Sequence, residues 1–372
     1  YIIKMMKRLA LRNIIATALL GLALMVMGWA LVHFDSEYLY RAQEQSLFMS
    51  GHLFLEESLS LPGGLMTWAA AYLTQYFFHP ACGVGIMVCL WALIMLVMQR
   101  ATHISATCAG WLLVLPAALL AAVVQMGYFM FYVKLQGYFF APTLGMLFVA
   151  VAMWGYRRSH YARLVWMLLV AAVGYPLVGA YSLIALAVMA VQAWAGGRQE
   201  TGWVWKAANV AWAALLAVIV PLLYYYIYTT VMREELWVAA LPCMQNGSHD
   251  MYTLRYPYYV MARAPMLVVL MSSPTMARAA DRFKVFCSVV VVALAGWGLY
   301  ASWFHDDLFD RELRMNHCVE EGDWEGVLRD ARGGFDFVPT RLIVMYRNLA
   351  LRKLGRSGEE QFSYRDGASK TK

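Results

Sequence analysis

Two carboxylates, Asp35 and Glu37, lie directly after the first long apolar run, at the start of a long segment, 33–80, in which apolar and polar residues alternate. An acid in this position could act as a general base, because a carboxylate accepts a proton from a hydroxyl group within reach. The spacing Asp-Ser-Glu leaves open which acid would be the base. Asp35 could instead cap a following helix, since Asp is a preferred N-cap residue. A metal site formed by His33, Asp35 and Glu37 is a third alternative. In that case the cofactor would be a divalent metal ion.

Basic residues supply candidates for binding a phosphate or a sugar. Arg263 lies inside an apolar segment, where ionisable residues are rare and usually paired or functional. Its guanidinium could bind phosphate through two parallel hydrogen bonds, or its side chain could extend to the nearby membrane interface. Four further candidates lie in predicted outer loops: Arg233, His249, Arg255 and Lys134. For each of these four, simple solvation at the surface is the alternative.

The composition indicates which kind of protein must position these residues. Hydrophobic residues make up 62% of the 372 residues and charged residues 14%. Soluble domains have about 45–50% apolar and about 25% charged residues. The sequence therefore predicts an all-α, polytopic helical membrane protein, and its 14 Trp and 23 Tyr suit interfacial aromatic belts. Membrane lipids are expected partners, and nucleic acid is not.

Nine apolar segments are predicted to cross the membrane as helices, which takes about 17–25 apolar residues each. They are predicted at 12–33, 81–99, 106–126, 138–156, 161–174, 178–195, 206–229, 257–272 and 284–303. The fifth and sixth are short and meet at 174–181, so they are either one broken hairpin or two full spans. His79-Pro80 is the predicted hinge where a surface helix turns into the second span.

Charge gives an independent orientation. With the N-terminus in the cytoplasm, thirteen basic residues lie in inner segments and four in outer loops. This is the positive-inside bias of a membrane protein. Nine spans then place everything after Trp303 on the outer side. The predicted domains are a transmembrane domain, 1–303, with an amphipathic outer loop at 34–80, and a soluble tail, 304–372.

The tail differs from the rest of the chain, with 12 Lys/Arg, 13 Asp/Glu and no long apolar run. The pattern predicts a first helix from Phe309 that closes at Gly322, a second helix capped by Asp323, and a third that ends before Gly355. Several residues of this region match a repeat pattern: Gly322-Asp-Trp324, Pro339, Asn348-Leu-Ala-Leu351 and Leu354-Gly355. The pattern resembles a tetratricopeptide repeat. One repeat cannot bury its own face, so further repeats are expected beyond it. A short helical hairpin resting on the membrane domain is the alternative.

The layout of a basic N-terminus, a first span, an acid at its outer end and a long amphipathic loop resembles the GT-C superfamily of membrane glycosyltransferases. The resemblance implies that Asp35, with Glu37 beside it, is the catalytic acid pair and that the sugar donor is linked to polyprenyl phosphate. The Tyr38–Phe48 region and the repeat-like tail also resemble an uncharacterised family of multi-pass Bacteroidales membrane proteins.

Two functions are therefore expected as alternatives. The first is a GT-C-like glycosyltransferase of the bacterial inner membrane that transfers a sugar from a polyprenyl-phosphate donor on the periplasmic side. The second is a non-enzymatic membrane scaffold whose periplasmic helical-repeat tail recruits an envelope complex, so that a protein partner binds the repeats. In both, the N-terminus is cytoplasmic and the tail is periplasmic.

Overall fold

The computed structural model describes residues 2–104, 106–132, 136–159, 162–195, 202–228, 231–241, 251–273, 281–332 and 338–364. Within these ranges the chain is all-α, and no strand is present. The chain divides into two compact units. The first, called here the helical bundle, comprises Tyr1–Phe34 and Ala42–Trp303, and the second, called here the C-terminal unit, comprises Asp35–Arg41 and Phe304–Lys372.

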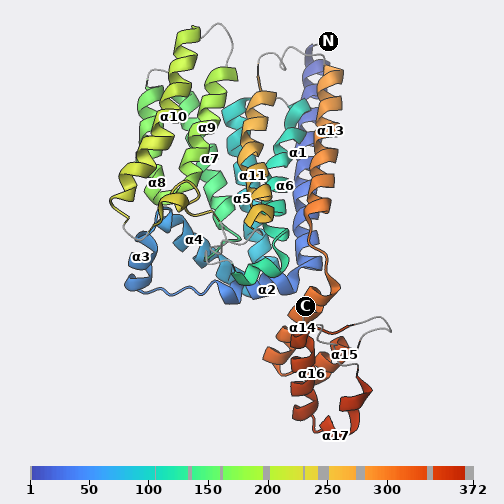
Figure 1. The fold of residues 1–372 in the computed structure, drawn as a ribbon. Coiled ribbons are helices and arrows are strands. Elements are labelled where there is room, and N and C mark those ends of the chain that lie inside the picture. The colour runs from blue at the N-terminus through green and yellow to red at the C-terminus, as the bar shows by residue number, and fades with distance from the viewer. Residues whose placement is uncertain are drawn as a thin grey trace. The chain divides into compact units, whose positions relative to one another are not determined.

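The helical bundle contains most of the helices in Figure 1. Its α-helices are α1 (Ile2–Phe34), α3 (His52–Leu59), α4 (Gly64–Thr74), α5 (Pro80–Thr102), α6 (Val114–Val124), α7 (Ala141–Arg158), α8 (Arg163–Val178), α9 (Ala180–Ala195), α10 (Trp203–Tyr225), α11 (Met251–Met271) and α13 (Asp281–Ser302). Its short 3₁₀ helices are η1 (Gln75–Phe78), η2 (Ala106–Leu113), η3 (Gly127–Tyr132) and η4 (Arg233–Glu235). Helix α2 (Ser36–Gln45) contains residues of both units.

The long helices of the bundle pack side by side. Helix α5 packs against α7, and α9 contacts α7, α8, α10 and α11. Helix α13 packs against α6 and η2, and α1 against α5 and η2. Figure 1 shows α8 and α10 along one side of the bundle and α1 and α13 along the other, with α3 and α4 at one end.

Each of the nine predicted spans contains a helical segment, but the boundaries differ. The third begins as the 3₁₀ helix η2, the seventh ends at Tyr225 and the eighth begins at Met251. Among the described residues, four helices are long and apolar enough to cross a membrane: Ile14–Phe34, Pro80–Thr102, Trp203–Tyr225 and Val285–Ser302. Shorter apolar helices occupy Ala109–Val124, Arg163–Val178, Ala180–Ala195 and Tyr259–Met271.

The break predicted within 174–181 lies at Gly179, which separates α8 from α9. Its φ of 62° and ψ of −133° suit glycine, and a Cβ there would lie 2.5 Å from the carbonyl oxygen of Ala239. The amide of Ala180 donates to that same carbonyl at 2.9 Å, and the amide of Gly63 donates to the carbonyl of Pro176 at 3.0 Å. The α8–α9 corner is therefore fixed by two loops that are distant in sequence.

The outer loop predicted at 34–80 forms helices rather than an open connector. Helix α4 packs its small residues against α7 and α8, and His79-Pro80 begins α5 with proline at the first helical turn, as predicted. The side chain of Gln75 binds the carbonyl of Ser46 and the side chain of Gln43. The hydroxyl of Ser46 accepts from the amide of Gly137 at 3.1 Å, so this loop is joined to the one before α7.

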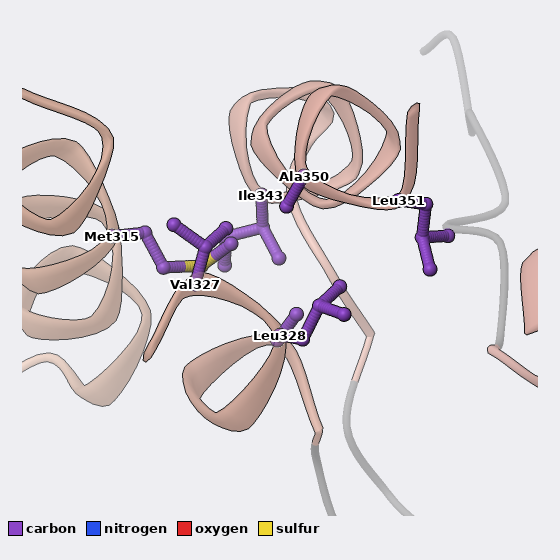
Figure 2. Close-up of a cluster of buried hydrophobic side chains, with 7 residues drawn as sticks. Met315, Val327, Leu328, Ile343, Ala350 and Leu351 are labelled. Carbon is purple, nitrogen blue, oxygen red and sulfur yellow. The ribbon is translucent and has the colours of Figure 1, made fainter. Parts of the chain in front are cut away.

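The C-terminal unit has its own apolar core. Its helices are α14 (Asp307–Glu321), α15 (Trp324–Ala331), α16 (Arg341–Lys353), α17 (Ser357–Glu360) and the 3₁₀ helix η5 (Gln361–Ser363). Seven buried side chains from α14, α15 and α16 form the cluster in Figure 2: Met315, Val327, Leu328, Ala331, Ile343, Ala350 and Leu351. The predicted caps are confirmed, because Gly322 ends α14 with φ of 77° and the Asp323 carboxylate accepts from the Gly326 amide at 3.0 Å.

Candidate functional site around Glu37 and His317

One of the two predicted catalytic acids binds a residue far along the chain. Within the C-terminal unit, Oε2 of Glu37 lies 2.5 Å from Nδ1 of His317 on α14. The ring of Tyr40 stacks on the imidazole, with centroids 4.5 Å apart and planes 9° apart. Nε2 of His317 lies 3.3 Å from Oε1 of Glu321, one helical turn further along α14. We call these four residues, Glu37, Tyr40, His317 and Glu321, the His317 cluster.

A second line of contacts runs beside the His317 cluster. Arg41 and Glu320 form an ion pair at 3.7 Å, and Asn316 donates to the Glu320 carboxylate at 2.6 Å. The hydroxyl of Tyr346, on α16, donates to the side-chain oxygen of Asn316 at 2.7 Å. The segment Asp35–Arg41 is thus tied to α14, and through α14 to α16, by side-chain contacts.

The electrostatics of His317 indicate what this arrangement can do. Burial lowers the pKa of the imidazole, but the hydrogen bond and charge of Glu37, together with Glu321, outweigh burial and raise the pKa above its usual value. An ionised carboxylate only accepts hydrogen bonds, so when the imidazole is charged it donates Nδ1–H to Glu37 and directs Nε2–H toward Glu321 at 3.3 Å. Both ring nitrogens are then occupied as donors. The cluster is suited to holding helices together rather than to taking a proton from a substrate.

Asp35 occupies the bend between α1 and α2. Its carbonyl accepts from the amide of Leu39 at 2.9 Å, the backbone arrangement of an N-cap residue. Its carboxylate oxygen Oδ2 is buried. The structure therefore places Asp35 where the capping interpretation requires it, and holds one of its oxygens away from solvent.

The predicted basic candidates fall in several places. Arg233 begins η4 in the helical bundle, and its guanidinium lies over the ring of Tyr225 at 5.2 Å. Arg263 lies on α11 and is exposed. Arg255 lies on the same helix, but its side chain is outside the described ones. His249 and Lys134 lie outside the described residues altogether.

The metal alternative needed His33, Asp35 and Glu37 together. In the helical bundle the His33 ring stacks on Trp29, with centroids 4.9 Å apart, while Glu37 binds His317. Across the described ranges, no group of three or more His, Cys, Asp or Glu residues is placed to hold a metal ion.

Sequence reasoning missed His317 and the role of Tyr40. The two partners Glu37 and His317 are 280 residues apart, and no motif connects them. The one signal available was local, because the run Glu320-Glu321 after His317 forms a carboxylate-rich helix end that favours a charged imidazole.

Helices throughout the described ranges, with four long and apolar enough to span a bilayer, define a helical membrane protein. Residues 8–371 match the model of the DUF6057 family, a family of unknown function, and the chain belongs to this family. The match extends over both the helical bundle and the C-terminal unit. No curated protein and no solved structure matches the chain.

Proposed function

We propose that this protein is a non-enzymatic membrane scaffold, whose helical bundle is embedded in the membrane and whose C-terminal unit recruits a protein complex. The observation that carries the proposal is the commitment of the Glu37 carboxylate to His317 at 2.5 Å. A base must reach a substrate hydroxyl, whereas this carboxylate is used to attach the segment after α1 to α14. The segment Asp35–Arg41, although it follows α1 directly in the chain, is thereby a structural part of the C-terminal unit.

The proposed topology has nine spans with a cytoplasmic N-terminus in the bacterial inner membrane. It is supported by the helical segments at all nine predicted ranges and by the excess of basic residues in the inner segments. The C-terminal unit is then periplasmic and built from tetratricopeptide-like helices. A reporter that fluoresces only in the cytoplasm, fused after Lys372, is expected to stay dark, and a bright fusion would contradict the nine-span count.

Co-purification from native membranes tests the scaffold directly. The full chain is expected to bring envelope proteins with it in stoichiometric amounts, and a variant that lacks 304–372 is expected to lose them while the bundle still inserts. Glu37→Gln is expected to weaken the capture, because it removes a charge from the His317 cluster. A full chain that purifies alone under mild conditions would contradict the proposal.

A second candidate function is supported by Asp35. Its carboxylate stands at the end of the first membrane helix with one oxygen buried, where an acid of a GT-C-like glycosyltransferase would be needed. In this function Asp35 takes the proton from an acceptor hydroxyl. Arg263 and Arg233 are the sequence-based candidates for binding the phosphate of a polyprenyl-linked donor, and they belong to the helical bundle, whereas Asp35 belongs to the C-terminal unit.

Asp35→Asn separates the two functions. Asn is as good an N-cap as Asp, so the fold is retained, but the amide cannot act as a base. Sugar transfer from a polyprenyl-phosphate donor, measured on purified protein, would fall by about 10²-fold or more if Asp35 is catalytic. Arg263→Lys keeps the charge but removes the two-pronged geometry, so a loss of about tenfold is expected if Arg263 binds phosphate. A scaffold gives no transfer in any variant, the wild type included.

A further inference from the structure

Helix α16 carries a concentration of positive charge within a unit that is otherwise balanced. The tail 304–372 has 12 basic and 13 acidic residues. Yet α16, with sequence RLIVMYRNLALRK, contains four basic residues and no acid. Acids lie on α14, α15 and α17, and α14 and α15 carry basic residues as well. On α16, Arg347 is buried, so its surface charge comes from Arg341, Arg352 and Lys353.

The same helix has two apolar faces. Ile343, Ala350 and Leu351 point into the core of the C-terminal unit, where Figure 2 shows Ile343 beside Met315 and Val327. A second set consists of Val338, just before the helix, and Leu342, Met345 and Leu349 on it, at spacings of four, three and four residues. The spacing of Leu342, Met345 and Leu349 places these three along one stripe of the helix, and Val338 lies in the non-helical segment before Thr340. We call the four residues the α16 stripe.

The α16 stripe is only partly covered by the described residues. Val338 is 50% exposed and Met345 55% exposed, while Leu342 and Leu349 are half-buried. Exposed and half-buried side chains therefore alternate along the set, which gives an uneven surface of the kind on which a second helix packs by interdigitation. Methionine at its centre adapts to partners of different shape.

Basic residues border the α16 stripe. At 100° per residue, Arg341 and Arg352 fall on one side of it and Lys353 on the other. Lys353 is held in place over the ring of Trp324, with its ammonium 5.8 Å from the ring centroid. Opposite charges across an interface steer association and suppress wrong partners.

We propose that the α16 stripe binds an amphipathic helix of a partner protein, in which an apolar face at i, i+3 or i+4, and i+7 is flanked by Asp and Glu. This inference rests on the proposed scaffold function and names its partner surface. A second copy of this chain fits less well, because its own α16 would bring like charges. A bilayer surface also fits less well, because binding there relies on bulky aromatic and aliphatic residues that all protrude.

The test uses the full chain in nanodiscs and two synthetic helical peptides. Both peptides carry the same leucine face, flanked by Glu in one and by Lys in the other. Fluorescence anisotropy is expected to show binding of the Glu peptide at least about tenfold tighter than the Lys peptide. Met345→Asp is expected to weaken binding of the Glu peptide by about tenfold or more, because it places a negative charge in the centre of the interface. Phe362→Asp, at an exposed apolar residue of η5, is expected to leave binding unchanged.

Other results would overturn the inference. Equal binding of both peptides, or full binding by Met345→Asp with its helicity intact, would show that α16 does not select an acidic helix. Loss of self-association in Met345→Asp, measured by light scattering, would assign the stripe to a second copy. Loss of binding to anionic vesicles in Met345→Asp would assign the α16 stripe to the membrane surface. If native complexes co-purify equally with wild type and with Met345→Asp, the scaffold function is supported but the α16 stripe is not its binding surface. If no complex co-purifies with wild type, the proposed scaffold function is itself contradicted.

Discussion

The helical bundle and the C-terminal unit both bury apolar side chains, but they differ on their surfaces. The bundle exposes large apolar residues along whole helices, such as Leu19, Leu22 and Met25 on α1, and it buries polar ones such as Thr143 and Asn209. The C-terminal unit forms one internal apolar cluster and has ion pairs on its surface, with fewer exposed apolar residues, such as Phe362. Helices that face hydrocarbon carry apolar side chains outward, whereas helices in water bury them. The contrast is the one expected if the bundle faces hydrocarbon and the C-terminal unit faces water.

The largest expected effect is a charge placed in the core of the C-terminal unit. Leu328→Asp buries an unpaired carboxylate between α15 and α16, which is expected to cost about 4 kcal/mol or more and to unfold this unit. Hydrogen exchange should then show loss of protection in α14–α16 while α5 and α7 keep theirs. Leu328→Met, which preserves volume and polarity, should cost less than about 1.5 kcal/mol. Simultaneous loss of protection in both units would mean that they do not unfold independently.

The next effect concerns the outer surface of the bundle. Leu22 is 60% exposed on α1, and Leu22→Arg is expected to cost about 3 kcal/mol of membrane insertion, because the side chain faces hydrocarbon. In the C-terminal unit Phe362 is 90% exposed, and Phe362→Arg should change stability by no more than about 0.5 kcal/mol. A glycosylation-based insertion assay measures the first and thermal unfolding the second. Equal tolerance at the two positions would remove the distinction between the solvents.

A smaller effect is expected at the α8–α9 corner. Gly179→Ala combines a left-handed φ with a Cβ 2.5 Å from the Ala239 oxygen, so a loss of about 2 kcal/mol is expected from thermal unfolding in detergent. Gly202→Ala is the matched control, since a Cβ there meets nothing within 4 Å and its φ is −59°. If both variants unfold alike, the corner is not the fixed point that its backbone geometry indicates.

Sequence alone predicted much of the fold because its signals are local. Apolar runs gave the all-α class and the positions of the helices, and Gly322 and Asp323 gave the boundaries of α14 and α15. The same reasoning singled out the acids after α1 as candidate catalytic residues, but it did not predict their contacts. Asp35 lies at a helix start, which a local pattern can indicate, whereas Glu37 binds a histidine 280 residues away. Such a pairing depends on tertiary structure, which leaves no period or motif in one sequence.

A double-mutant cycle shows whether Glu37 serves as a structural partner of His317. The raised pKa of His317 means that its stabilising effect is fully present below its usual value, about 6.5, and is lost as pH rises through the raised value. For Glu37→Gln and His317→Gln, hydrogen exchange of α14 in the full chain should give a coupling energy of about 1 kcal/mol at pH 6, because the pair is partly exposed. The coupling should shrink toward zero at pH 9. Zero coupling at both pH values, or coupling that grows with pH, would contradict the claim.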